Sequence, residues 1–309
     1  MEKITSIEQI NFSRLLKVCI RAARRAAAEI LEIYNRPFSV AYKSDHSPVT
    51  EADKRADAVI SEILRQEYPS FFILSEESYE AAAESETALR RRMENPFCFI
   101  VDPLDGTKEF VKRNNEFTVN IALSYCGRAV AGVVYIPVSG TLYYAAKDFG
   151  AYKCTAAPLS AVSFSEENRK PVIASAKTDC AEPELFCPRD QIRVSERSGH
   201  VVCVTTSAVV DEQTTQLLNR CKEYILDVVK TASAIKVCCI AEGRADVYVK
   251  YGYTMEWDTA AEQIIVEEAG GIFRQLDEAR SEMTYNRKDC CNRKGFYVLN
   301  RPENMLLDF

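Results

Sequence analysis

The chain of 309 residues is long enough for one large domain or two closely packed ones, and its composition, 47% hydrophobic and 27% charged, is typical of a folded globular protein. It has no run of roughly 18 apolar residues that could cross a membrane and no apolar leader before a cleavage site, so we expect a cytoplasmic protein with no membrane partner. The net charge of −6 argues against a nucleic-acid partner, because nucleic-acid binders collect Lys and Arg to neutralise phosphates.

The first half is predicted to combine helices with an antiparallel sheet. Helical spacing of apolar residues predicts an amphipathic helix over residues 6–34, and a second helix begins after Thr50, its expected N-cap. Short apolar strands at 71–74 and 97–101 each end in acids, and the acidic segment 80–94 between them is predicted to be a solvent-facing connection. Further strands, in the rhythm of an antiparallel meander, are predicted at 117–125, 129–136, 142–146 and 151–154.

The second half alternates strands and helices and is predicted to be α/β. The expected strands are 201–205, 224–228, 245–249 and 296–299, and the expected helices are 211–221, 235–243 and 259–269. We therefore predict a layered sandwich of helices and sheets, with an α+β N-terminal lobe over residues 1–160 and an α/β C-terminal lobe over residues 161–309. The change in composition near residues 155–170 marks the boundary.

Acidic residues gather at the ends of predicted elements. Asp102 and Asp105 follow the strand 97–101 in a turn stiffened by a proline and a glycine, so both carboxylates can reach one cation. Glu76 follows another strand, and Asp258 opens a helix in the other half. With only two histidines in the chain, these carboxylate and backbone oxygens suit two or three Mg²⁺ ions.

Each acid also has an ordinary structural interpretation. Asp102 and Asp105 fit a plain turn, because a bare pair at this spacing arises by chance. Asp258 fits the N-cap of the helix that follows it, and Glu76 fits a solvated loop. Asp53, three residues after the N-cap of the second helix, fits a capping box with no catalytic duty.

Two longer strings give the sequence a family resemblance. Residues 102–107 (DPLDGT) and 256–261 (EWDTAA), with 268–271 (EAGG) behind the second, resemble the two signatures of the inositol monophosphatase superfamily. Further matches lie at residues 47–53, 74–77 and 241–246. The resemblance covers about residues 40–300 and implies alternating helix and sheet layers, a Mg²⁺-dependent phosphatase activity and inhibition by Li⁺.

Within that superfamily, residues 108–114 (KEFVKRN) and 116–122 (EFTVNIA) resemble the 3′(2′),5′-bisphosphate nucleotidases, which convert adenosine 3′,5′-bisphosphate to AMP and phosphate. By this resemblance Asp53 and Thr107 position and activate the attacking water. The implied metal ligands are Glu76, Asp102, the carbonyl of Leu104, Asp105 and Asp258. The predicted substrate side consists of Ser233, Lys236 and Lys250, which match nucleotide-contacting positions, together with Gly106, Thr107 and Asp258.

The departures from that pattern lie on the substrate side. Residues 232–236 read ASAIK where relatives often have Gly-Ser-Ser-x-Lys, and Lys250 stands where an arginine is expected. The usual histidine before residue 211 is replaced within Val209-Val210. An inositol phosphate phosphatase therefore stays open as an alternative. A catalytically silent phosphometabolite-binding protein is a third, and the retained acids argue against it.

Overall fold

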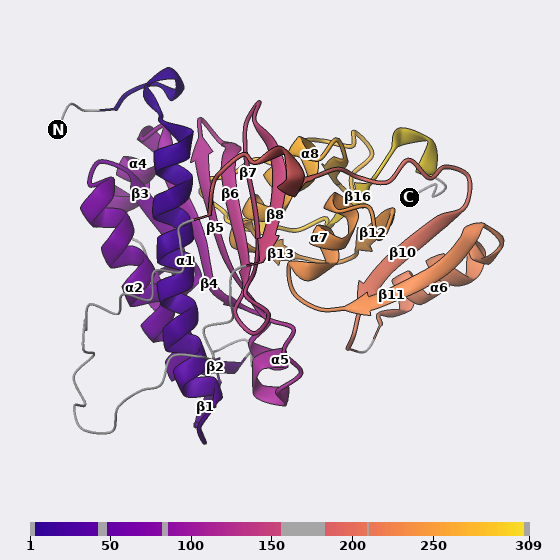
Figure 1. Cartoon of the computed structure of the whole chain (residues 1–309), viewed down its shortest axis with the longest axis horizontal. Coiled ribbons are helices and arrows are strands. Elements are labelled where there is room, and N and C mark those ends of the chain that lie inside the picture. Colours follow the sequence, from indigo (N-terminus) through magenta and orange to yellow (C-terminus); the bar gives the residue numbers. More distant parts are fainter. Residues whose placement is uncertain (1–3, 43–47, 82–85, 156–182, 209, 306–309) are drawn as a thin grey trace.

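The computed structural model describes residues 4–42, 48–81, 86–155, 183–208 and 210–305. Two large sheets dominate these residues, and helices lie outside and between them (Figure 1). The successive layers are α1 (Phe12–Tyr34) with α2 (Glu51–Glu67), a seven-stranded sheet, α8 (Ala260–Glu268) with α7 (Ile235–Ala241), a five-stranded sheet, and α6 (Glu212–Arg220). The layered sandwich predicted from the sequence is confirmed.

The seven-stranded sheet contains the predicted meander. Its strand order is β3-β4-β5-β6-β7-β8-β9, and the neighbours are antiparallel apart from the parallel pair β3 and β4. The strands are Phe72–Ser75 (β3), Phe97–Asp105 (β4), Thr118–Tyr125 (β5), Arg128–Ile136 (β6), Thr141–Ala146 (β7), Gly150–Thr155 (β8) and Gln191–Ile192 (β9).

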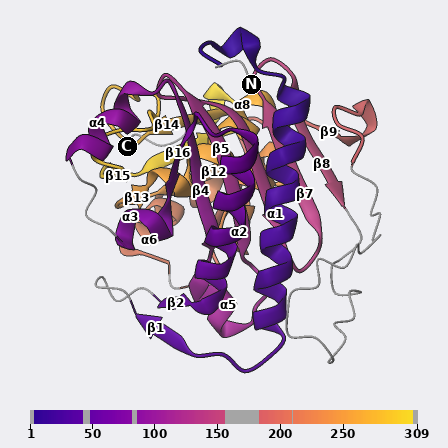
Figure 2. The ribbon, with the colours of Figure 1, turned by 90° about the vertical axis from the view of Figure 1, so that its left-hand side faces the viewer.

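Helices α1 and α2 lie side by side over one face of this sheet (Figure 2). A buried, alanine-rich stripe on α1 lets the two helices pack closely. The predicted start of α1 at residue 6 is too early, because Asn11 caps the helix and Ile7–Gln9 forms a separate 3₁₀ turn. Thr50 caps α2 as predicted, with its side chain accepting from the backbone of the first turn.

Helix α8 packs against the opposite face of the seven-stranded sheet. The approach is close because β6 has a glycine at the crossing. A Cβ on Gly132 would lie 2.5 Å from Cγ2 of Ile264 and 2.8 Å from the carbonyl oxygen of Ala261. Any side chain there would therefore push away the helix that follows Asp258.

The five-stranded sheet is mixed, in the order β11-β10-β12-β16-β14. β10 is parallel to β11 and β12, whereas β16 is antiparallel to β12 and β14. The strands are Val201–Thr206 (β10), Ile225–Thr231 (β11), Val247–Lys250 (β12), Ile272–Gln275 (β14) and Phe296–Leu299 (β16). The predicted alternation is confirmed, and β14 is an additional strand that the sequence analysis missed.

Shorter elements connect these layers. Two small antiparallel pairs are β1 (Val40–Tyr42) with β2 (Pro48–Thr50) and β13 (Thr254–Met255) with β15 (Cys291–Asn292). The short helices are α3 (Glu76–Ala81), α4 (Glu86–Glu94) and α5 (Thr107–Lys112). Further 3₁₀ turns are Pro188–Asp190, Lys222–Tyr224, Glu256–Asp258 and Pro302–Asn304. Across the described ranges, no helix combines the length and apolarity needed to cross a membrane.

The prediction that residues 80–94 form only a solvent-facing connection is wrong for the part that the structure describes. Residues 86–94 form α4, and Arg92 on this helix is only 2% exposed. Its guanidinium donates to Oδ1 of Asn286 at 2.7 Å and to the carbonyl oxygen of Arg287 at 3.2 Å. The charged composition of this segment suggested a loop, but the segment forms a helix. Arg92, its buried residue, contacts a loop that is distant in the sequence. Residues 82–85 lie outside the described residues.

The predicted lobe boundary near residue 160 also lies outside the described residues, which stop at 155 and resume at 183. β9 follows that gap and pairs with β8, so the seven-stranded sheet includes residues from both predicted lobes. The division at residue 160 stays a prediction.

Candidate active site

The acids predicted as metal ligands lie where several elements meet at one edge of the seven-stranded sheet. β3 and β4 are parallel neighbours, with Ser75 in register with Val101. The next residues along the chain, Glu76 and Asp102, therefore lie side by side, where β3 ends and β4 continues beside β5. Asp258 ends the 3₁₀ turn before α8, and that turn contacts β4 and β5.

The turn at the end of β4 is fixed by its own hydrogen bonds. The backbone N–H of Leu104 donates to Oδ1 of Asp102 at 3.0 Å, and the Thr107 hydroxyl lies 3.2 Å from the Leu104 carbonyl oxygen. Gly106 has a φ of 91°, and a Cβ there would lie 3.0 Å from the carbonyl oxygen of Glu116. Glycine is therefore required at this position, in line with the stiff turn expected from the sequence.

The two oxygens of Asp53 make different contacts, one expected of a capping box and one with Thr107, its predicted catalytic partner. The backbone N–H and the hydroxyl of Thr50 donate to Oδ2 of Asp53 at 2.7 and 2.8 Å, which completes the predicted capping box. The Thr107 hydroxyl donates to the other oxygen, Oδ1, at 3.0 Å. The start of α2 is thus tied to the start of α5.

The environment of Asp53 suits a proton acceptor. Burial raises its pKa from the ordinary value of 3.8 to about 6, hydrogen bonds from Thr50 oppose the shift, and the charge of Glu77 adds to it. A carboxyl group that titrates near neutral pH can accept and release a proton during turnover.

Asp105 is held from both halves of the chain. Its Oδ2 accepts from the Ser233 hydroxyl at 2.8 Å and from the backbone N–H of Ala234 at 2.7 Å. Thr118 and Asn120 on β5 each place a donor 3.3 Å from the same oxygen. The predicted metal ligand Asp105 and the predicted substrate contact Ser233 are therefore direct neighbours.

The pKa of Asp102 shows that the acids lie close together. Burial raises its pKa well above the ordinary value, and the charges of Glu76, Asp105 and Asp258 raise it further, in that order. Four acids from three elements, α3, β4 and the 3₁₀ turn before α8, thus share one electrostatic neighbourhood.

Asp258 is the member contributed by the second half. Burial raises its pKa to about 7, Asp105 adds to the shift, and a 2.6 Å hydrogen bond from the Met255 N–H opposes it together with the charges of Lys236 and Lys250. Both predicted substrate lysines are therefore close enough to act on this carboxylate.

This shift predicts how the metal-free protein responds to pH. The folded state favours protonated Asp258, so its contribution to the free energy of unfolding is largest below pH 3.8 and falls as pH rises to about 7. Asp258→Asn removes the penalty and keeps an acceptor for Met255. In EDTA, we expect the variant to gain about 3 kcal/mol on wild type between pH 5 and pH 8. Urea unfolding at both pH values measures this, and a constant difference would contradict the buried, repelled carboxylate.

The alternative role of Asp258 as the N-cap of α8 is wrong, because Thr259 occupies that position. Sequence analysis missed how the turn before it is anchored. Glu256 is fully buried, and it accepts from the N–H groups of Asn286 and Arg287 at 2.6 and 3.0 Å and from the Arg287 Nε at 3.0 Å. The partners of Glu256 lie in a loop about 30 residues further along the chain, so no local sequence pattern could have indicated this contact.

Another acid was also missed. Glu262 on α8 is 4% exposed, and burial raises its pKa well above the ordinary value. The charges of Asp105 and Asp258 add to the shift, whereas Lys236 opposes it. A glutamate on a helix of a globular protein usually faces solvent, so the residue type alone could not predict that Glu262 is buried beside the site.

The two predicted substrate lysines lie at the border of this acidic neighbourhood. The ammonium of Lys236 donates to the carbonyl oxygen of Ser233 at 2.9 Å and lies 5.7 Å from the ring centre of Tyr248. Lys250 ends β12. Near it, Asp211 is the N-cap of α6; burial opposes a lowered pKa of Asp211, hydrogen bonds from Thr214 lower it, and the charge of Lys250 adds to the lowering. The two cations thus border the acids on the side of the five-stranded sheet.

The acids lie near one another but are not arranged as the complete coordination shell of a metal ion. Among residues 4–42, 48–81, 86–155, 183–208 and 210–305, no three His, Cys, Asp or Glu side chains converge as ligands of one ion. The donor set nevertheless fits a hard divalent cation, because it is made of buried carboxylates whose repulsion a cation relieves.

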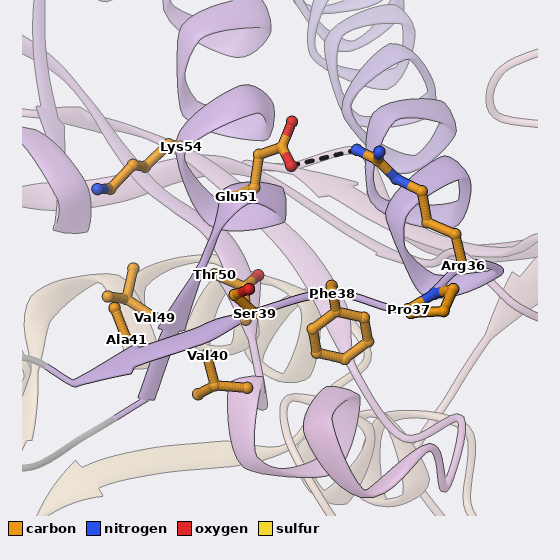
Figure 3. Close-up of a pocket in the computed structure, with 10 residues that line it drawn as sticks. All are labelled: Arg36, Pro37, Phe38, Ser39, Val40, Ala41, Val49, Thr50, Glu51 and Lys54. Atoms are coloured by element: carbon orange, nitrogen blue, oxygen red, sulfur yellow. Dashed lines mark hydrogen bonds and ion pairs between the residues drawn. The ribbon is translucent and has the colours of Figure 1, made fainter.

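A separate hollow of about 620 Å³ lies beside the start of α2 (Figure 3). Phe38 and residues of β1 and β2 line it, together with Arg36 and Glu51, which form an ion pair at 3.1 Å. Thr50 connects this hollow to Asp53. The predicted metal ligands do not line it, so the hollow and the acids are neighbouring but distinct features.

Comparison with known proteins agrees with the geometry. Residues 11–301 match the Inositol monophosphatase family. The 3′(2′),5′-bisphosphate nucleotidase CysQ of Salmonella typhimurium is 36% identical over 92% of this chain and 98% of its own. CysQ of Escherichia coli K12 is 34% identical over 91% of this chain and 98% of its own. The crystal structure of CysQ from Bacteroides thetaiotaomicron, 34% identical, covers 94% of this chain and 99% of its own with a TM-score of 0.72.

The match extends over nearly the whole chain, and the layers follow the same arrangement. The chain belongs to the inositol monophosphatase family.

Proposed function

We propose that the protein is a Mg²⁺-dependent phosphomonoester hydrolase that converts adenosine 3′,5′-bisphosphate to AMP and phosphate. The observation that carries the proposal is the match, over 92% and 91% of the chain, to relatives named 3′(2′),5′-bisphosphate nucleotidase. The buried acids at the edge of the seven-stranded sheet support it, because they supply the oxygen ligands that Mg²⁺ prefers.

The metal side of the site would consist of carboxylates and one backbone carbonyl. Two or three Mg²⁺ ions would be held by Glu76, Asp102, the carbonyl of Leu104, Asp105 and Asp258. The chemistry that bound Mg²⁺ supplies is polarisation of the phosphoryl oxygens and a lower pKa for the attacking water. Mutual repulsion among the acids favours cation binding, since each bound charge relieves it.

Asp53 and Thr107 would carry the proton. The Thr107 hydroxyl donates to Asp53, so it can take a proton from the attacking water while it passes its own to the carboxylate. The pKa of Asp53, raised to about 6, places this acceptor near neutral pH. Water is then the nucleophile, and no side chain forms a covalent intermediate.

The substrate side would be formed by backbone and lysine donors. The N–H groups of Gly106 and Thr107 would hold the phosphate to be transferred, with Asp258 beside it. Lys236 and Lys250 would contact the phosphate that is not cleaved. Both lie at the border of the acids, where their positive charges act on Asp258.

Lys236→Ala and Lys250→Ala should therefore impair only bisphosphate substrates. Each removes a charge-assisted hydrogen bond, so we expect KM for adenosine 3′,5′-bisphosphate to rise roughly tenfold to hundredfold with little change in kcat. Steady-state kinetics on this substrate and on inositol 1-phosphate measure the effect, with Lys222→Ala, an exposed lysine, as the control. Equal losses on both substrates would mean that the lysines support the fold or the acids instead.

The proposal itself is tested by incubating the purified protein with adenosine 3′,5′-bisphosphate. We expect AMP and phosphate in equal amounts with Mg²⁺ and none in excess EDTA. Adenosine 3′-phosphate as the product would mean that the wrong phosphate was assigned, and full turnover in EDTA would contradict the role of the acids. An inositol phosphate phosphatase is the competing function, and it predicts release from inositol 1-phosphate or inositol 1,4-bisphosphate instead.

A further inference from the structure

We propose that Ser233 is a positioning residue that fixes the carboxylate of Asp105 and acts on the reaction only through it. This inference rests on the proposed function, in which Asp105 holds Mg²⁺. The Ser233 hydroxyl and the next backbone N–H, that of Ala234, lie 2.8 and 2.7 Å from the same oxygen, Oδ2 of Asp105. Two consecutive donors from the second half thus hold one carboxylate of the first half.

The other neighbours of this carboxylate complete the same arrangement. Thr118 Oγ1 and Asn120 Nδ2 also lie 3.3 Å from Oδ2 of Asp105. In the part of the chain that the structure describes, all side-chain hydrogen bonds of Asp105 are made at Oδ2, so Oδ1 is the oxygen left for a ligand. Outer hydrogen bonds of this kind orient a metal-binding carboxylate.

The backbone of Ser233 is shaped for this contact. Its φ of 58° lies in the left-handed region, which residues other than glycine seldom adopt, and there its hydroxyl and the following N–H reach one acceptor. The residue is 7% exposed, and its Cβ lies 3.3 Å from where a Cβ on Gly106 would stand. Ser233 is therefore packed against the turn that carries the acids.

The family resemblance instead assigned this serine to the nucleotide. A serine hydroxyl has one proton and two lone pairs. In this structure, Oγ of Ser233 lies 2.8 Å from Oδ2 of Asp105, 3.2 Å from the Asp105 carbonyl oxygen and 2.8 Å from Oγ1 of Thr118. The single proton of the hydroxyl is directed to Asp105, so Ser233 has no proton left to donate to a phosphate oxygen of the substrate.

The two roles predict different results for Ser233→Ala. A positioning role predicts that Mg²⁺ affinity, measured by calorimetry on the metal-stripped protein, and kcat each fall roughly tenfold to hundredfold. KM for adenosine 3′,5′-bisphosphate should stay at the wild-type value. Ser207→Ala is the matched control, because the Ser207 hydroxyl also joins the two halves, through Glu116 at 2.8 Å, without touching Asp105. It should behave as wild type.

A rise in KM for the nucleotide with unchanged Mg²⁺ affinity would overturn the proposal, and so would wild-type behaviour in every measurement. If Ser233→Ala does not fold, Ser233→Gly serves instead, because it removes the hydroxyl and tolerates the positive φ; the same results are expected of it. The calorimetric comparison also stands if the wild-type protein fails to hydrolyse adenosine 3′,5′-bisphosphate. That failure would contradict the proposed function, whereas equal Mg²⁺ affinities of the wild type and Ser233→Ala would contradict the role of Ser233.

Discussion

Asp105→Asn should lower phosphate release by on the order of a thousandfold or more while the protein still folds. The amide oxygen can accept the hydrogen bonds from Ser233 and Ala234, so the shape of the site is kept. One negative charge is lost from the group of acids that is proposed to hold at least two divalent cations. Initial rates with saturating Mg²⁺ and adenosine 3′,5′-bisphosphate measure the loss.

The same variant separates a metal ligand from a turn residue by its stability. In EDTA it should melt no earlier than wild type, because the charge of Asp105 raises the pKa of Asp102 and Asp258 and its removal relieves that repulsion. Asp227→Asn, an exposed acid on β11, is the control and should keep full activity. Near-normal turnover in Asp105→Asn would reduce Asp105 to a turn residue.

Asp53→Asn should reduce kcat roughly a hundredfold to ten-thousandfold, because it removes the group that accepts the proton through Thr107. The sign of the pH effect follows from the raised pKa of about 6. In wild type, the fraction of ionised Asp53 falls with pH through this value, so kcat/KM should decline on the acid side. The variant should lose this limb of the profile.

The control for Asp53→Asn is Glu51→Gln, on the same first turn of α2. Glu51 is exposed and pairs with Arg36 at 3.1 Å, so its loss should leave kcat and the pH profile unchanged. An acid limb that persists unaltered in Asp53→Asn would show that Asp53 serves only in the capping box of α2.

Much of the candidate site could be predicted from the sequence, because its information is local. In the sequence, Asp102 and Asp105 directly follow a run of apolar residues, and Asp53 lies one turn into a capped helix, so local patterns alone place these acids near element ends. In the structure, β4 continues through Asp105. The parallel pairing of β3 with β4 then brings Glu76 beside Asp102. Local patterns indicated which acids to consider, and the sheet determines that they meet.

The rest depends on contacts between residues far apart in the chain. Ser233 is 128 residues from the carboxylate that it contacts, and Arg92 is 194 residues from Asn286. No periodicity or spacing encodes such a pair. The family resemblance assigns Ser233 to the substrate, and the contact of its hydroxyl with Asp105 could be found only in the structure.

The central claim is the choice of substrate, and a competition experiment tests it most directly. The protein, Mg²⁺ and equal concentrations of adenosine 3′,5′-bisphosphate and inositol 1-phosphate are mixed, and phosphorus NMR follows both substrates in one tube. The ratio of the two rates then equals the ratio of their kcat/KM values. We predict that adenosine 3′,5′-bisphosphate is converted to AMP while inositol 1-phosphate remains; consumption of inositol 1-phosphate first would contradict the proposed function.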